Sequence, residues 1–289
     1  GVAAEGSPLS WPISEYQGQQ LVLDSFYPHG QQQRTIEVFN KGTVPFEFSA
    51  KASADWVKLS HSSGKINIEQ QIAVSVDWSK AQTGLNNAEV HIQGTGWGGA
   101  KIQLAAVKPA TTATQGFVEA DGYIAIEAAS GKVVANNKQA WWQEIPGHGR
   151  THSSMSTMTV PDYQPGALTQ APYLEYPLFF HSTGSFTLHS IVAPTLDLVP
   201  GRGLRFAVAL NNNPPQLVDT LADNSQQVWE KSVLDGVRII KSQLQVTKPG
   251  AHTLRIYLVD PALVLQKLLI DTGGLKPSYL GPQESKRLR

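Results

Sequence analysis

The chain has 289 residues, of which 41% are hydrophobic and only 16% charged, and its formal net charge is zero. This length is enough for two ordinary domains, and the charged fraction lies well below the usual quarter. A neutral balance does not indicate a nucleic-acid-binding surface or strong attraction to an acidic membrane, so we expect neither as a partner.

The chain contains no cysteine, which excludes disulfides, thiolate metal ligands and a cysteine nucleophile. No run approaches the roughly 18 apolar residues of a membrane-spanning helix. The N-terminal stretch GVAAEGSPLSWP lacks the basic start and apolar core of a signal peptide. Because residues 1–20 are small, polar and bear Pro and Gly, we expect them to form an extended lead-in, as in a linker within a larger protein.

Short strands separated by turns follow from Leu21 onward. The alternation of apolar and polar residues is clear at 34–39 and 72–78. Seven short strands over 21–108 predict an immunoglobulin-like β-sandwich, of the fibronectin kind because no cysteine pair is present. The expected strands are 19–26, 33–40, 46–52, 57–60, 66–76, 88–94 and 101–107.

Residues 109–118 are rich in Thr and Ala and show no periodicity, which indicates a linker. A second and larger β domain is expected over 119–271, with a helical turn in 225–234, and an extended tail over 272–289. About ten strands in this domain predict a jelly-roll sandwich, so the whole chain is predicted to be all-β. These strands are 123–128, 142–144, 154–159, 173–180, 184–191, 205–210, 216–220, 237–245, 250–258 and 264–270.

Motifs for catalysis are missing from the sequence. It has no GxSxG elbow, no HExxH pair and no Walker loop. Four acidic residues of the second domain cannot be paired from sequence, and we interpret them as solvated or turn-capping groups: Glu127, Glu175, Asp197 and Asp219. We therefore predict no catalytic residue in this chain.

Aromatic residues beside polar loops indicate a carbohydrate site in the second domain. Flat rings stack on the apolar faces of sugars, and Arg or Asn side chains bind their carboxylates and hydroxyls. The predicted binding residues are Trp142, Arg150, Asn211 and Trp229. Since side chains alternate along a strand, at least one of Trp141 and Trp142 is expected to point into the core.

Four stretches of the second domain resemble the C-terminal domain of glycoside hydrolase family 115, the xylan α-1,2-(4-O-methyl)-glucuronidases. They are EADGYIAIEAA at 119–129, WQEIPGHGRTHSSM at 142–155, PTLDLVPGRGLRFAVALNNNPPQ at 194–216, and the segment 249–285, which contains LLIDTGGLKPSYLGP. Residues 36–64 and 74–78 are similar to the Ig-like segment that precedes that domain in the family.

The resemblance implies that the chain is a non-catalytic C-terminal region, because the family's active site lies in N-terminal catalytic domains. Its expected partners are those catalytic domains, a second protomer in a homodimer, and glucuronoxylan. The resemblance also implies an extracellular or periplasmic location. The alternatives are an autonomous carbohydrate-binding module that recognises glucuronoxylan and an adhesion or scaffold protein built from two sandwiches.

The start of the second domain also resembles carbohydrate-binding module families 6 and 35. In those families an E-A-E run and an acid on the last strand enclose a structural calcium ion, whose preferred ligands are oxygens. Here Glu127 matches the first acid and Asp271 the last, while Ala129 stands where the second acid would be. A calcium ion held by Glu127 and Asp271 is thus the one cofactor that the resemblance suggests, and otherwise we expect none.

Overall fold

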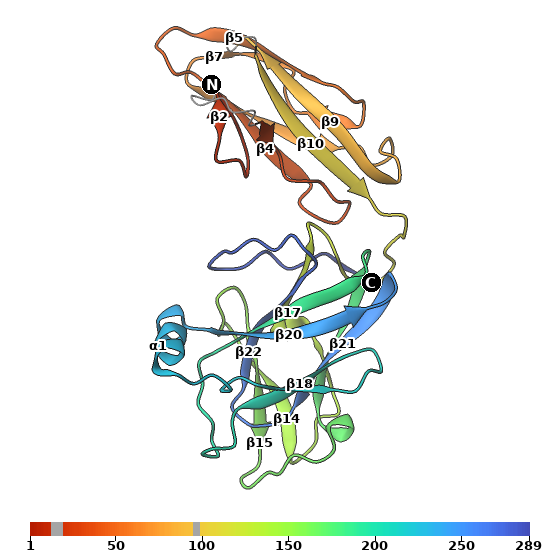
Figure 1. Ribbon diagram of the computed structural model, residues 1–289, viewed down its shortest axis with the longest axis vertical. Coiled ribbons are helices and arrows are strands. Elements are labelled where there is room, and N and C mark those ends of the chain that lie inside the picture. The colour runs from red at the N-terminus through yellow and green to blue at the C-terminus, as the bar shows by residue number, and fades with distance from the viewer. Residues whose placement is uncertain (13–19, 95–98) are drawn as a thin grey trace. The chain divides into compact units, whose positions relative to one another are not determined.

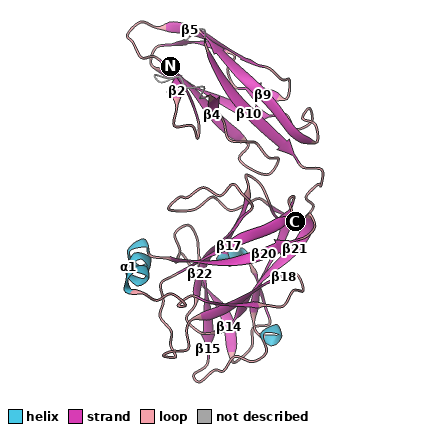
Figure 2. Ribbon diagram, viewed as in Figure 1, coloured by secondary structure: helices cyan, strands magenta, loops and turns pink. Residues whose placement is uncertain are grey.

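Strands dominate both halves of the chain (Figure 2). The computed structural model describes residues 1–12, 20–94 and 99–289, and it divides into two units, Gly1–Ala110 and Thr111–Arg289 (Figure 1). Each unit contains two sheets that enclose a hydrophobic core, which is the architecture of a β-sandwich. The prediction of an all-β chain with two sandwiches is confirmed.

The described part of the first unit forms two sheets with the strand orders β2-β1-β4-β8-β6 and β3-β10-β9-β5-β7. Their bounds are β1 Val2–Ala4, β2 Ser10–Trp11, β3 Leu21–Val22, β4 Gln33–Phe39, β5 Phe46–Ala52, β6 Val57–Leu59, β7 Ser63–Ile66, β8 Glu69–Val76, β9 Gly84–Gln93 and β10 Ala100–Lys108. Every second residue of β4 and β9 points inward, so that Ile36 and Val38 from one sheet and Val90 and Ile92 from the other are fully buried.

The expected lead-in over 1–20 is wrong in its first part. Val2 and Ala4 lie on β1, which pairs with β4, and both side chains are buried in the core. The segment is too short for its alternation to be recognised, and its pairing with β4 makes it a strand. The strand expected at 66–76 is also divided in two, as β7 and β8. Residues 13–19, which include the first residue of the expected strand 19–26, lie outside the described residues.

The second unit also has two sheets, ordered β19-β18-β21-β16-β11-β23, with β13 beside β16, and β14-β15-β22-β17-β20, with β12 beside β22. The bounds are β11 Gly116–Val118, β12 Tyr123–Glu127, β13 Lys132–Val134, β14 Ala140–Ile145, β15 Ser154–Thr159, β16 Tyr173–Phe180, β17 Gly184–Val192, β18 Arg205–Leu210, β19 Gln216–Asp219, β20 Arg238–Val246, β21 Gly250–Leu258, β22 Val264–Asp271 and β23 Arg287–Leu288. Side chains such as Tyr176, Phe206, Leu188 and Ile270 fill the space between the sheets and are fully buried.

Helix α1, Gln226–Asp235, lies at the side of this sandwich (Figure 1). It has 10 residues and is therefore longer than the single turn expected there. It ends at Gly236, whose φ of 68° is left-handed, a conformation that glycine adopts without steric cost. In the described part of the chain, no helix is long and apolar enough to cross a membrane.

The expected linker and tail both contribute strands to the second unit. Strand β11 falls within the expected linker 109–118, and Phe117 and Val118 are fully buried. Strand β23 falls within the expected tail and pairs with β11, with Phe117 opposite Arg287. These pairs are too short to produce a periodic pattern, so only the assembled sheet reveals them.

Candidate functional site

Trp142 lies inside the second sandwich. Its side chain is only 3% exposed, and its ring nitrogen Nε1 donates a hydrogen bond of 3.3 Å to the carbonyl oxygen of Pro172. The prediction that Trp142 stacks on a sugar is therefore wrong, because the ring is part of the core. The neighbouring Trp141 is only partly buried and lies opposite Met158, as strand alternation requires.

Trp229 is placed on helix α1 and is 43% exposed. Val233, one turn further along, and the adjacent Leu234 are 48% and 86% exposed. These three side chains give α1 an apolar surface that reaches solvent. The ring of Trp229 is accessible to a sugar or to another protein surface, and its role in carbohydrate binding stays a prediction.

Arg150 joins three segments of the second unit. Its guanidinium donates a 2.7 Å hydrogen bond to the carbonyl oxygen of Tyr279 and a second hydrogen bond to that of Asp235, the last residue of α1. It also lies 4.1 Å from the centroid of the Tyr279 ring, a cation–π contact. Because carbonyl groups at a helix C-terminus carry partial negative charge, a cation is favoured at this position. Arg150 is thus engaged in holding the tail and α1.

Asn211 follows β18 in the opposite sheet and has a φ of 57°, a left-handed conformation that Asn tolerates better than most residues. Its side-chain amide donates to Nδ1 of His252 over 2.9 Å, and its side-chain oxygen accepts from the amide of Thr253 over 3.0 Å. The four predicted binding residues therefore do not form one site. Trp142 is in the core and Asn211 belongs to the other sheet. Trp229 lies on α1, and Arg150 touches α1 only at its last residue, Asp235.

Two tyrosines and an ion pair lie together on the outer face of the β16-β21 sheet, the face turned away from the main core. The rings of Tyr173 and Tyr257 are 5.1 Å apart, and Nε of Arg255 donates to Oε2 of Glu175 over 2.9 Å. The Arg255 guanidinium also lies 5.5 Å from the Tyr173 ring centroid. Hydrogen bonding to Glu175 raises the pKa of Arg255 above its already high ordinary value. We call these four residues the Tyr–Arg cluster.

The sequence contains only half of the signal for the Tyr–Arg cluster. Tyr173 and Glu175 are two residues apart on β16, and Arg255 and Tyr257 are two apart on β21, so each pair shares one face. What joins the pairs is the register, in which Tyr173 lies opposite Tyr257 and Glu175 opposite Arg255. That register depends on two strands separated by four others along the chain, which sequence reasoning did not pair.

Other acidic residues hold the backbone of turns. Asp219 accepts hydrogen bonds from the amides of Leu204 and Leu221 at 3.0 and 2.9 Å, and Asp197 accepts one from Gly201 at 3.1 Å. The interpretation of these carboxylates as turn-capping groups agrees with these contacts. In these contacts both carboxylates bond to backbone amides, and neither faces another carboxylate.

The structure does not bring Glu127 and Asp271 together, so the expected calcium pair is wrong. In the antiparallel pairing of β12 with β22, Asp271 lies opposite Tyr123 at one end and Glu127 lies opposite Lys267 at the other. Asp271 instead accepts hydrogen bonds from the amides of Gly273 and Leu275 in the following turn. Nζ of Lys267 lies 3.0 Å from Oε1 of Glu127.

The residues around Glu127 do not fit a calcium ion. Calcium requires six to eight oxygen ligands, several of them carboxylates, whereas a lysine ammonium already neutralises this carboxylate. Across residues 1–12, 20–94 and 99–289, no three His, Asp or Glu side chains gather closely enough to hold a metal ion.

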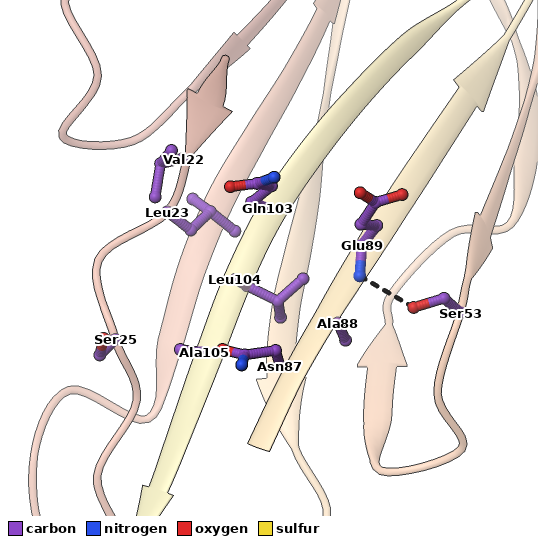
Figure 3. A pocket seen from close by; sticks show the side chains of 10 residues that line it. All are labelled: Val22, Leu23, Ser25, Ser53, Asn87, Ala88, Glu89, Gln103, Leu104 and Ala105. Carbon is purple, nitrogen blue, oxygen red and sulfur yellow. Dashed lines mark hydrogen bonds between the residues drawn. The ribbon is translucent and has the colours of Figure 1, made fainter. Parts of the chain in front are cut away.

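The first unit has an open pocket of about 620 Å³ beside β3, β9 and β10 (Figure 3). Polar side chains of β9, of β10 and of two loops line it, and the Glu89 amide donates a 2.9 Å hydrogen bond to Oγ of Ser53. Its lining residues are Val22, Leu23, Ser25, Ser53, Asn87, Ala88, Glu89, Gln103, Leu104 and Ala105. No aromatic ring is among them, so this pocket lacks the stacking surface that sugar sites commonly use.

The second unit is thus a β-sandwich whose two sheets enclose one core. Residues 116–284, more than half of the chain, match the family model described as "Glycosyl hydrolase family 115 C-terminal domain". The chain therefore belongs to glycoside hydrolase family 115, and residues 116–284 are its C-terminal domain.

Several solved structures are similar to this chain at low sequence identity. One is BtGH115A, a 4-O-methyl-α-glucuronidase with specificity for decorated arabinogalactans, at 21% identity and a TM-score of 0.39, covering 50% of this chain. This chain spans only 17% of that protein's length. A search of curated proteins found no match.

Two further similar structures are carbohydrate-binding modules. The C-terminal family 6 module of LamC from Zobellia galactanivorans has 16% identity and a TM-score of 0.35, covering 52% of this chain and 98% of the module. A family 35 module from Clostridium thermocellum has 12% identity and a TM-score of 0.34, covering 51% of this chain and 97% of the module.

Proposed function

We propose that this chain is the non-catalytic C-terminal region of an extracellular or periplasmic α-glucuronidase and that it supports the catalytic domains of that enzyme. The observation that carries the proposal is the match of residues 116–284 to the C-terminal domain of family 115. On this proposal the chain contributes a folded platform, and the acid and base that cleave the glycosidic bond are supplied by the rest of the enzyme.

The contacts of the acidic residues support a non-catalytic role. Glycoside hydrolysis generally requires two carboxyl groups that face each other across the sugar, about 5–9.5 Å apart. Glu175 is bonded to Arg255, Glu127 to Lys267, and Asp219 to backbone amides. These carboxylates stabilise the fold, and a group held this way is poorly placed to transfer protons to a substrate.

The test is an assay of the isolated chain beside the full-length enzyme. Both are incubated with glucuronoxylan and with a glucuronic-acid-decorated arabinogalactan, and the release of 4-O-methylglucuronic acid or glucuronic acid is measured by chromatography. We expect release by the full-length enzyme and none by the chain alone. Release by the purified chain that persists through a second purification step would overturn the proposal.

We propose further that helix α1 contacts another protein surface, either the catalytic domains or a second protomer. Trp229, Val233 and Leu234 support this, because exposed apolar side chains grouped on one helix are a common feature of interfaces. Sedimentation velocity of the full-length enzyme and of its Leu234→Glu variant tests for the protomer contact. A dimer that dissociates in the variant supports the second protomer; a variant that stays dimeric argues against it.

The second candidate function is carbohydrate binding, and the Tyr–Arg cluster favours it. Arg255 is 26% and Glu175 27% exposed, so their polar groups reach solvent beside the ring of Tyr173. An aromatic ring offers a stacking surface, while a guanidinium can bind the carboxylate of a uronic acid. We propose glucuronoxylan as the ligand of this surface.

Affinity electrophoresis with and without glucuronoxylan tests this second function. We expect the polysaccharide to retard the chain and Tyr173→Ala to weaken binding by about 0.5–1.5 kcal/mol, the contribution of one aromatic contact. Ile239→Ala is the matched control, because this side chain is 51% exposed on β20 of the opposite sheet, and the variant should bind as the unaltered chain does. Equal migration at all polysaccharide concentrations would exclude the function.

A further inference from the structure

Glu127 and Lys267 form an ion pair on the outer face of the sheet that contains β22. Their side chains are only 10% and 4% exposed, although both carry full charges. They lie directly opposite each other on β12 and β22. Alternation places them on the same face as Ala125 and Leu269, whose small apolar cluster lies on the outer side of the sheet. The pair is therefore buried outside the main core, so another part of the chain must cover this face.

The cover is the segment that follows β22. The amide of Glu127 donates to Oε1 of Glu284 over 2.8 Å, and the amide of Ala125 donates to Oγ of Ser285 over 3.0 Å. In return the amide of Ser285 donates to the carbonyl oxygen of Ala125 over 2.8 Å. Residues 284 and 285 thus run along the edge of β12 that β22 leaves free.

The Lys267 ammonium lies where this covering segment crosses the sheet. Its Nζ donates to the carbonyl oxygen of Leu280 over 3.4 Å. The next residue, Gly281, has a φ of 70° and lies over the aliphatic stem of Lys267. Oε1 of Glu127 also accepts a 2.7 Å hydrogen bond from the hydroxyl of Thr151. A carboxylate, a hydroxyl and a backbone carbonyl therefore belong to one network with the ammonium at its centre.

Burying a charge costs several kcal/mol unless a partner of opposite charge and further hydrogen bonds compensate for the lost water. Clusters of oxygen atoms such as this one often bind a hard metal cation, which neutralises their negative charge. We infer that the Lys267 ammonium takes the place of a metal ion and attaches residues 279–285 to the outer face of the sheet. This attachment therefore does not depend on a bound metal. The inference stands apart from the proposed function, since it concerns the stability of the second unit alone.

The first test is metal dependence of the unaltered chain. Thermal unfolding is followed by circular dichroism after dialysis against EDTA and again with added CaCl₂. Because the ammonium already neutralises Glu127, we expect the same Tm in both solutions. A Tm that falls in EDTA and recovers with calcium would overturn the inference, since a ligand that binds the folded state must raise its Tm.

The second test removes the charge with Lys267→Met, which keeps most of the aliphatic stem. Leaving the buried Glu127 carboxylate unpaired should lower Tm by about 6 °C or more. The amide of Ser285 should also exchange its hydrogen faster, because the segment loses its attachment. Lys286→Met is the matched control: this lysine is exposed and directly follows the segment, and its loss should change neither quantity.

Two further variants separate the network from a general loss of stability. In a double-mutant cycle, Glu127→Gln combined with Lys267→Met should lower Tm by less than the two single losses together, because the charges act as a pair. If Lys267→Met does not fold, Thr151→Val serves instead, with a smaller fall in Tm and faster exchange at Ser285. Unchanged exchange at Ser285 in a folded variant, or additive losses in the cycle, would overturn the inference.

Discussion

Strand alternation gives adjacent tryptophans opposite surroundings. On β14 the Trp142 ring is enclosed by the core and bonded to the Pro172 carbonyl, while Trp141 faces outward. The pattern of the sequence establishes only that the two must differ. Which of them enters the core depends on how β14 meets β15, and that information lies in the partner strand.

Trp142→Ala should destabilise the second unit by about 3–5 kcal/mol, because truncating a buried aromatic ring leaves a cavity. Trp229→Ala is the control, since a ring that is 43% exposed loses fewer contacts, and its cost should stay below about 1 kcal/mol. Urea denaturation followed by fluorescence measures both. Equal losses in the two variants would contradict the placement of Trp142.

Asp77 in the first unit provides a residue-level prediction on pH. The Ser79 hydroxyl and the Lys58 ammonium hold its pKa at about 2, below the ordinary value of 3.8. Since the folded state lowers this pKa, its stabilising effect is present above pH 3.8 and is lost as the pH falls toward 2. Ser79→Ala should move the pKa of Asp77 up toward 3.8, as measured by NMR titration of the carboxyl carbon. An unchanged titration curve would show that the hydroxyl has no part in the shift.

At the scale of elements, strands with a full alternating pattern could be predicted and the shortest ones could not. The bounds of β5, β15, β16, β18 and β21 were predicted to the residue, because each is a continuous β-forming run of six to nine residues. Strands β1, β11, β13 and β23 have two or three residues each and exist because a neighbour supplies hydrogen bonds. The candidate sites follow the same division. Glu127 and Glu175 could be singled out from the sequence, but their partners Lys267 and Arg255 could not, because the pairing depends on strand register.

Strand β11 begins at Gly116, which lies very close to the backbone of β16. With a φ of 81°, a Cβ at this position would lie 2.7 Å from the backbone of Pro177. Gly116→Ala should therefore cost about 1–3 kcal/mol more than the strain of the positive φ alone. Gly201→Ala is the matched control, because Gly201 has a φ of 77° with open space around it. Chemical denaturation of both variants measures the difference, and similar costs would contradict a close approach of β11 to β16.

At the scale of the whole molecule, two separate cores predict two separate unfolding events. The core of the first unit lies within residues 1–110 and that of the second within 111–289, and they share no residue. Calorimetry of the chain should show two transitions, each also seen when the unit is produced alone. Limited proteolysis should cleave first near residues 109–115, between β10 and β11. A single transition that neither isolated unit reproduces would mean that the units fold only together.

The pairing of β11 with β23 has a practical consequence for engineering. Because Gly116 lies opposite Leu288, the first and last strands of the second unit are immediate neighbours. A short Gly/Ser peptide could therefore join its two ends without crossing the sandwich, and the chain could be reopened at the exposed turn 161–162. Such a circularly permuted protein should keep both sheets and the fastened segment 279–285, and it would offer new attachment points for fusion to other proteins.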